Sequence, residues 1–165
     1  MTGRIVWFTG LPASGKSTLA ERLRARLVQR GTCAVILDSD AIRGALGASI
    51  YTPAARDAFY LALGELALVI ARQGVIVLVA ATAPRRTHRD HVRDRGFPIL
   101  EVWVTADAAT CASRDVKGLY AAAGRGELAT LPGAGATFEP PVHADLTATG
   151  GMDDAALAEL EQLLA

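Results

Sequence analysis

Residues 10–17 read GLPASGKS, which satisfies the phosphate-binding pattern G-x-x-x-x-G-K-[ST]. A short apolar run at residues 5–8 precedes this segment, and an apolar-periodic stretch begins at residue 16. The sequence therefore predicts a strand, a glycine-rich turn and a helix, the setting in which backbone N–H groups surround phosphate oxygens at a helix N-terminus. We predict a nucleotide-binding loop; the alternative is a glycine-rich turn with a solvated lysine.

Two side chains of this loop have a predictable chemistry. Lys16 would reach the β and γ phosphates of ATP, and the hydroxyl of Ser17 would bind Mg²⁺. ATP and Mg²⁺ are thus the expected ligands of the loop.

Composition excludes several classes of partner. The 165 residues carry 17 basic and 17 acidic side chains, so we expect no broad positive field for nucleic acid or for an anionic membrane. The longest apolar run, residues 75–83, is about half of a membrane span. The first residues lack a long apolar stretch, so no signal peptide is expected and a cytoplasmic protein is predicted.

The cysteines and histidines give no metal-binding pattern. Cys33 and Cys111 are isolated and lack C-x-x-C spacing, so we interpret both as small core residues. The three histidines show no ligand spacing with them, and a zinc site is not expected.

Apolar strands alternate with helical stretches along nearly the whole chain. This alternation predicts one α/β domain, residues 1–165, with a five-stranded parallel sheet flanked by helices. Ligands are then expected beyond the carboxyl ends of the strands. The expected strands span residues 4–9, 33–37, 75–80, 99–104 and 145–148. The expected helices span residues 16–30, 41–46, 54–73, 86–95, 108–113 and 153–164.

Residues 116–143 differ from the rest of the chain in composition and in hydrophobic pattern. They are rich in glycine and show no clear periodicity. Loops of this length in compact domains are commonly active-site lids or disordered segments, and beside a phosphate-binding loop we favour a lid.

Acidic residues follow the second strand and not the third. Residues 81–83, which end the third strand, contain no acid, whereas Asp38 and Asp40 end the second. One carboxylate could hold Mg²⁺ through water, and the other could orient or deprotonate an attacking hydroxyl. The alternative is that Asp40 only caps the helix that begins at Ala41.

Cations gather after several expected strands. Phosphoryl transfer needs positive charge near the transferred group, and Arg43, Arg56, Arg114 and Lys117 are placed to supply it. Arg114 and Lys117 flank the entrance of the expected lid. A lone surface arginine is commonly solvated. The position of these cations beyond the ends of strands is therefore the only reason within the sequence to select them.

Taken together, these motifs resemble the adenylylsulfate kinases. The resemblance covers nearly the whole chain, and its most specific part is RDVKGLY at residues 114–120, similar to the family's R-D-x-K-G-L-Y lid entrance. Other matching segments are residues 10–18, 37–43, 83–84 with Arg89, 138–141 and 144–146. The resemblance implies a three-layer P-loop kinase fold, transfer of the γ-phosphate of ATP to the 3′-hydroxyl of adenosine 5′-phosphosulfate, Mg²⁺ dependence and a homodimer.

The same resemblance implies roles for individual residues. Asp38 and Asp40 match paired acids of which the second is the expected base, Lys117 matches the lid cation, and Ser17 with Asp38 would hold Mg²⁺. The ATP site would comprise Gly10, Ala13, Ser14, Gly15, Lys16, Ser17, Thr18 and Arg114. The acceptor site would comprise Asp40, Arg43, Tyr51, Arg56, Ala83, Pro84, Lys117 and Leu131.

The chain departs from the family pattern mainly on the acceptor side. An Asn-x-Arg-Arg run of the family is here Phe59-Tyr60-Leu61-Ala62. Ala83, Arg85 and Leu131 also replace a serine and two aromatic residues. Loss of the polar side chains that bind an acceptor can change substrate specificity strongly. The resemblance therefore predicts the type of reaction better than it predicts the substrate. A nucleoside, sugar or specialised-metabolite acceptor, or a nucleotide-binding module without phosphotransfer, are the alternatives.

Overall fold

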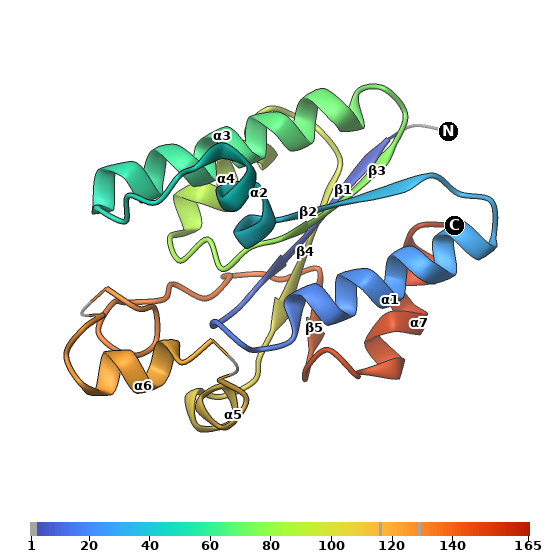
Figure 1. Ribbon diagram of the computed structural model, residues 1–165. Coiled ribbons are helices and arrows are strands. Elements are labelled where there is room, and N and C mark those ends of the chain that lie inside the picture. The colour runs from blue at the N-terminus through green and yellow to red at the C-terminus, as the bar shows by residue number, and fades with distance from the viewer. Residues whose placement is uncertain (1–2, 116, 129) are drawn as a thin grey trace.

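A computed structural model describes residues 3–115, 117–128 and 130–165. Its centre is a sheet of five parallel strands in the order β2-β3-β1-β4-β5 (Figure 1). The strands are β1 (Arg4–Thr9), β2 (Ala34–Asp38), β3 (Ile76–Ala80), β4 (Ile99–Val104) and β5 (Leu146–Ala148). The predicted parallel α/β sheet is confirmed, with strand ends that differ from expectation by one residue at most.

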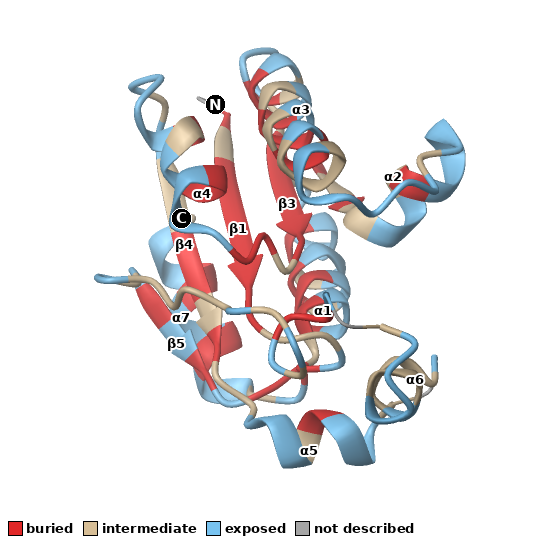
Figure 2. Cartoon of the chain, turned by 90° about the vertical axis from the view of Figure 1, so that its left-hand side faces the viewer, coloured by how far each residue is buried: buried red, intermediate tan, exposed pale blue. Residues whose placement is uncertain are grey.

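Helices cover both faces of the sheet. On one face lie α1 (Lys16–Gln29) and α7 (Asp154–Leu163), and on the other lie α3 (Pro53–Ala71) and α4 (Arg86–Arg93). Alternate residues of β1 enter the two layers: Val6 and Phe8 pack with α1 and α7, whereas Ile5 and Trp7 pack with α3. The central strands are thus buried on both sides, as Figure 2 shows, which explains their uninterrupted apolar sequence.

Three short helices, α2 (Ser39–Leu46), α5 (Ala108–Ser113) and α6 (Leu119–Gly124), follow the strands at the carboxyl edge of the sheet. The last of them was not expected, because residues 116–143 show no helical periodicity. Its backbone N–H groups at Leu119, Tyr120 and Ala121 donate to the carboxylate of Asp115 at 2.7–3.1 Å. This acid caps a helix too short to reveal a period. Val116, in the lid-entrance motif, lies outside the described residues.

One predicted burial is wrong. Cys33 is exposed at the turn before β2, whereas Cys111 is buried as expected. Trp7 is fully buried, and Trp103 on β4 is only partly so. Each helix in the described part of the chain is too short or too polar to cross a bilayer.

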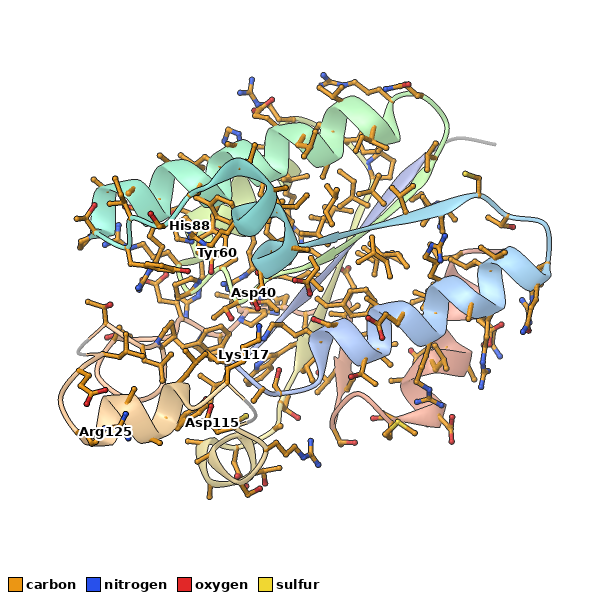
Figure 3. All side chains as sticks on the ribbon, viewed as in Figure 1. Asp40, Tyr60, His88, Asp115, Lys117 and Arg125 are labelled. Carbon is orange, nitrogen blue, oxygen red and sulfur yellow. The ribbon has the colours of Figure 1, made fainter. Side chains whose placement is uncertain are left out.

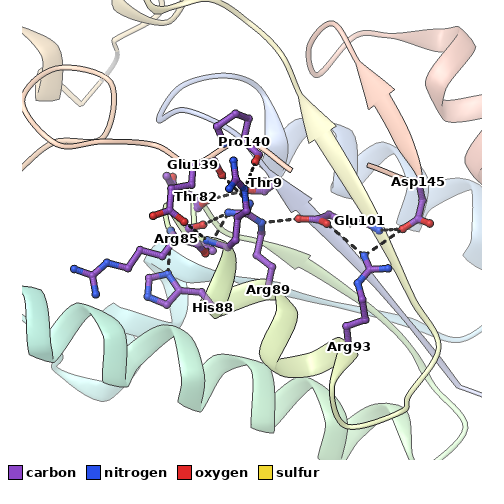
Figure 4. Close-up of polar contacts among 12 residues, drawn as sticks. Thr9, Thr82, Arg85, His88, Arg89, Arg93, Glu101, Glu139, Pro140 and Asp145 are labelled. Atoms are coloured by element: carbon purple, nitrogen blue, oxygen red, sulfur yellow. Dashed lines mark hydrogen bonds and ion pairs between the residues drawn. The ribbon is translucent and has the colours of Figure 1, made fainter. Parts of the chain in front are cut away.

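A buried ion pair ties α4 to the sheet (Figure 4). The guanidinium of Arg89 donates to the Glu101 carboxylate at 2.5 Å and to the carbonyl oxygens of Ala83 and Glu139 at 2.5 and 2.7 Å. Arg89 therefore joins the loop after β3 to the segment that returns toward β5.

Candidate active site

A cavity of about 1550 Å³ opens at the carboxyl edge of the sheet. It lies among the phosphate-binding loop, the β2–α2 junction, residues 114–115, 117–128 and 130–132, and residues 149–153. Most residues predicted for the two binding sites line it: Ala13, Gly15, Lys16, Ser17, Thr18, Asp38, Asp40, Arg43, Tyr51, Arg56, Arg114, Lys117 and Leu131. The structure thus brings the predicted ATP and acceptor residues to one cavity.

Four predicted residues do not line the cavity. Gly10 and Ser14 belong to the loop backbone beneath it, and Ala83 and Pro84 lie in the loop after β3. The carbonyl oxygen of Ala83 accepts from Arg89 at 2.5 Å, and that of Pro84 accepts from the Glu139 N–H at 2.8 Å. In this structure both therefore shape the loop and do not face the cavity.

The glycines of the phosphate-binding loop are required by close backbone contacts. At Gly15, where φ is 103°, an added Cβ would lie 2.3 Å from the backbone nitrogen of Gly151. At Gly10, with φ of 148°, it would lie 2.4 Å from the carbonyl oxygen of Val104. Only glycine permits the loop to pack this closely against its neighbours.

Lys16 is the buried cation of the site. Its ammonium donates to the carbonyl oxygens of Gly10 and Leu11 at 3.1 and 2.7 Å, inside the curve of the loop. Burial lowers the pKa of Lys16 to about 8, although Cys111 and Asp40 act in the opposite direction. The Asp40 carboxylate thus favours the charged form of Lys16, across the two predicted halves of the site.

The side-chain oxygens of Asp38 and Ser17 lie together in the same cavity as Lys16. The Ser17 hydroxyl donates to Oδ2 of Asp38, while Oδ1 accepts from the backbone N–H groups of Asp40 and Ala41 at 2.9 and 3.2 Å. Asp38, not Asp40, is therefore the N-cap of α2. The alternative prediction that Asp40 only caps this helix is wrong, and the Asp40 carboxylate makes no capping bond.

Asp40 instead faces the segment that follows α5. Its carboxylate pairs with the ammonium of Lys117, as Figure 3 shows, and this hydrogen bond raises the pKa of Lys117. Both side chains are more than half exposed, at 65% and 61%. An acid and a cation are thus paired at the wall of the cavity, both open to a ligand.

Arg43 lies one turn after Asp40 and is 7% exposed. Its guanidinium carbon lies 3.7 Å from the ring centroid of Phe59, 4.9 Å from that of Tyr51 and 5.7 Å from that of Tyr60. Burial raises the pKa of Tyr60. The sequence predicted Arg43 and Tyr51 for the acceptor site, but gave no signal that Phe59 would contact the arginine.

Residues of the segments 117–128 and 130–132 lie beside the phosphate-binding loop and α3. The Tyr120 hydroxyl donates to the carbonyl oxygen of Pro12 at 3.0 Å, and burial raises the pKa of Tyr120. Arg56 donates to the carbonyl and the hydroxyl oxygens of Thr130 at 2.9 and 3.1 Å. Thr130 was not predicted, because nothing in the sequence pairs it with a residue in α3.

The two arginines after β3 lie outside the cavity lining. Arg85 pairs with Asp57 at 2.6 Å, and Asp57 also contacts the buried His88, at 2.8 Å. Burial lowers the pKa of His88 despite this contact. Arg86 binds Glu139 through its backbone and Pro140 through its side chain. Arg85 thus contacts a residue of α3, and Arg86 contacts residues 139–140.

Comparison with known proteins identifies the family. The family described as "Adenylylsulphate kinase" matches residues 2–149. This chain belongs to the adenylylsulfate kinase family. The adenylyl-sulfate kinase of Paraburkholderia xenovorans is 40% identical over 146 residues, which cover 87% of this chain and 82% of that protein. That of Deinococcus deserti is 42% identical over 147 residues, covering 88% and 81%.

Solved adenylylsulfate kinases share the fold. The Mycobacterium tuberculosis APS kinase CysC, in complex with AMPPNP and APS, superposes with a TM-score of 0.90 at 34% identity, covering 99% of both chains. A hexameric APS kinase from Thiobacillus denitrificans matches with a TM-score of 0.69 at 28% identity over 99% of this chain and 29% of that one. The expected P-loop kinase fold is confirmed.

Proposed function

We propose that this protein transfers the γ-phosphate of ATP to the 3′-hydroxyl of adenosine 5′-phosphosulfate, giving ADP and 3′-phosphoadenosine 5′-phosphosulfate. The observation that carries the proposal is that Lys16 of the phosphate-binding loop and Asp40 of α2 line one cavity. This arrangement would hold a triphosphate and an alcohol face to face. The names of the relatives, and the APS bound to the Mycobacterium tuberculosis enzyme, support the choice of acceptor.

Each charged side chain then has a role in the transfer. Asp40 accepts the proton of the attacking hydroxyl, while Lys16 and Lys117 stabilise the negative charge that spreads over the migrating phosphoryl group. The remaining loop residues hold the triphosphate, and Arg114 lies near the base of ATP. Asp40 can act as the base because its carboxylate is not used as the helix cap.

Ser17 and Asp38 fit a magnesium ion. They provide a hydroxyl and a carboxylate that already touch each other, and Mg²⁺ favours oxygen ligands, of which the protein commonly supplies only one or two. Across residues 3–115, 117–128 and 130–165, no cluster of three or more His, Cys, Asp or Glu side chains could hold a metal alone. Bound there, Mg²⁺ would neutralise charge on the β and γ phosphates.

The acceptor would occupy the opposite half of the cavity. Arg43 and Arg56 are the cations available to its anionic group, and Tyr51 and Leu131 supply apolar surface for its adenine. The loss of the family's polar Asn-x-Arg-Arg run at residues 59–62 favours a second candidate, a related kinase with a different hydroxylated acceptor. Both candidates use the same ATP half of the site.

A panel of acceptors distinguishes the two. ADP production is measured with adenosine 5′-phosphosulfate, adenosine, other nucleosides and simple sugars at fixed ATP and Mg²⁺. Half-saturation at micromolar adenosine 5′-phosphosulfate, with the other acceptors at least a hundredfold poorer in kcat/KM, supports the first candidate. Preference for another alcohol overturns it while leaving kinase activity intact.

The homodimer, the closing lid and the cytoplasmic location are part of the same proposal. Light scattering of the purified protein, with and without both substrates, measures its mass and tests the dimer. Limited proteolysis within residues 117–136 tests the lid: we expect cleavage to slow when ADP and acceptor are both bound, because a closed segment is protected.

A further inference from the structure

The contact between Arg43 and Phe59 joins α2 to the second turn of α3. The guanidinium carbon lies 3.7 Å from the Phe59 ring centroid, so the ring covers one face of this cation. Phe59 is itself buried and meets Tyr60 edge-on, with ring centroids 5.5 Å apart. The guanidinium thus packs against a ring that is itself held in the core, which restricts the rotamers of Arg43.

The hydrogen-bonding capacity of Arg43 is unused by the described residues. Its guanidinium forms neither a hydrogen bond nor an ion pair with any of them, although a guanidinium carries five N–H donors. Nearby arginines differ: Arg56 is bound by Thr130, and Arg89 by Glu101. A nearly buried cation without a carboxylate is costly, and an aromatic face offsets only part of that cost.

We propose that Phe59 is a positioning residue that stacks on Arg43 and turns the N–H edge of its guanidinium toward the cavity, where it binds the anionic group of the acceptor. The face of the guanidinium is occupied by the ring, so the donors in its plane are left for a ligand. A planar fork suits the paired oxygens of a phosphate or sulfate group. The inference rests on the proposed function, and it assigns a specific task to a position where the family pattern has asparagine.

The test removes the ring and keeps the apolar volume. In Phe59→Leu and Phe59→Met we expect KM for adenosine 5′-phosphosulfate to rise roughly 3- to 30-fold, the range between an exposed and a desolvated cation–π contact. KM for ATP and kcat should change little, because Phe59 does not line the cavity that Lys16 and Asp40 share. Phe59→Tyr should restore the low KM, since it keeps the ring. Phe138→Leu is the matched control, because this ring lies 5.8 Å from the guanidinium carbon of Arg89. Arg89 already donates hydrogen bonds to protein groups and lies outside the cavity.

Binding measurements separate a positioning role from a general packing role. By calorimetry, AMP should bind Phe59→Leu more weakly than wild type by the same factor, while adenosine, which lacks the anionic group, should bind both proteins equally. Equal losses for AMP and adenosine, a fall in kcat, or failure of Phe59→Tyr to rescue would overturn the inference. Wild-type protein that binds AMP as described but does not turn over adenosine 5′-phosphosulfate would contradict the proposed function alone.

Discussion

The ammonium of Lys117 pairs with the carboxylate of Asp40 across 77 positions of sequence. This ion pair connects the residue before α6 and its N-cap Gly118 to the first turn of α2, at the wall of the cavity. It places a cation beside the proposed base before any substrate is present. The ion pair therefore couples the two proposed roles, because the cation that is proposed to stabilise the transferring phosphoryl group contacts the proposed base.

Asp40→Asn tests the proposed base. We expect kcat to fall roughly 10²- to 10⁴-fold, the contribution of a positioned general base, because an amide cannot take the proton of the hydroxyl. The affinity for AMPPNP should change less than threefold, since Asp40 does not bind the loop. Coupled ADP production measures the first quantity and calorimetry the second.

Glu127→Gln is the control for that substitution. Glu127 is an exposed acid of the same segment that pairs with Arg125 at 2.8 Å, away from the cavity lining. Its kcat should equal that of wild type. If Asp40→Asn and Glu127→Gln behave alike, Asp40 is not the base.

The binding of ATP should depend on the charge of Lys16. Burial places the pKa of Lys16 at about 8, below the ordinary value for lysine, so in the free protein it is protonated below pH 8 and neutral above. Phosphate binding favours the protonated form, and the AMPPNP affinity should therefore be level below pH 7 and fall up to about tenfold per pH unit above pH 8. Calorimetry from pH 6.5 to 9.5 measures it.

Lys16→Met provides the reference for this pH series. Its binding should be weak at every pH and should lack the fall above pH 8. A wild-type affinity that is unchanged up to pH 9.5 would show that burial does not depress this pKa in solution.

The Mg²⁺ requirement should depend on Asp38. Asp38→Asn keeps the N-cap of α2, because asparagine caps as well as aspartate, but removes the charge beside Ser17. We expect the Mg²⁺ concentration for half-maximal activity to rise about tenfold or more with little loss of thermal stability. Asp107→Asn, the same change at the N-cap of α5, should leave that concentration unchanged. Equal Mg²⁺ curves for the two variants would remove Asp38 from the metal site.

The ATP half of the site could be predicted from sequence because its geometry is local. The spacing of Gly10, Gly15, Lys16 and Ser17 within one strand–loop–helix unit fixes their relative positions. The parallel sheet then places the carboxyl end of β2 beside this loop, which brings Asp38 to Ser17. Uninterrupted apolar strands and well-capped helices likewise gave bounds close to those observed.

The acceptor half could not be predicted to the same depth because its contacts are between distant segments. Nothing local indicates that Phe59 stacks on Arg43 or that Thr130 binds Arg56. One alternative from the sequence made Asp40 the cap of α2, whereas the cap is Asp38. The sequence could not distinguish them, because two acids one residue apart fit the same cap pattern. The side chain that caps is chosen by the backbone at the end of β2, which only the structure shows.

The buried pair of Arg89 and Glu101 should contribute strongly to the stability of the fold. The side chains of both residues are 7% exposed or less, and Arg89 also binds two carbonyl oxygens. Arg89→Met leaves the Glu101 carboxylate buried, with the partly exposed Arg93 3.3 Å away. We therefore expect the free energy of unfolding to fall by roughly 3–5 kcal/mol. The double variant Arg89→Met/Glu101→Met should lose less free energy of unfolding, because it removes the unpaired buried charge as well.

Urea denaturation measures the stability of both variants. Arg125→Met, at an exposed ion pair, is the control and should change the free energy of unfolding by less than about 1 kcal/mol. If the single and double variants lose the same amount, or if Arg89→Met matches the control, the pair does not stabilise the fold in this way.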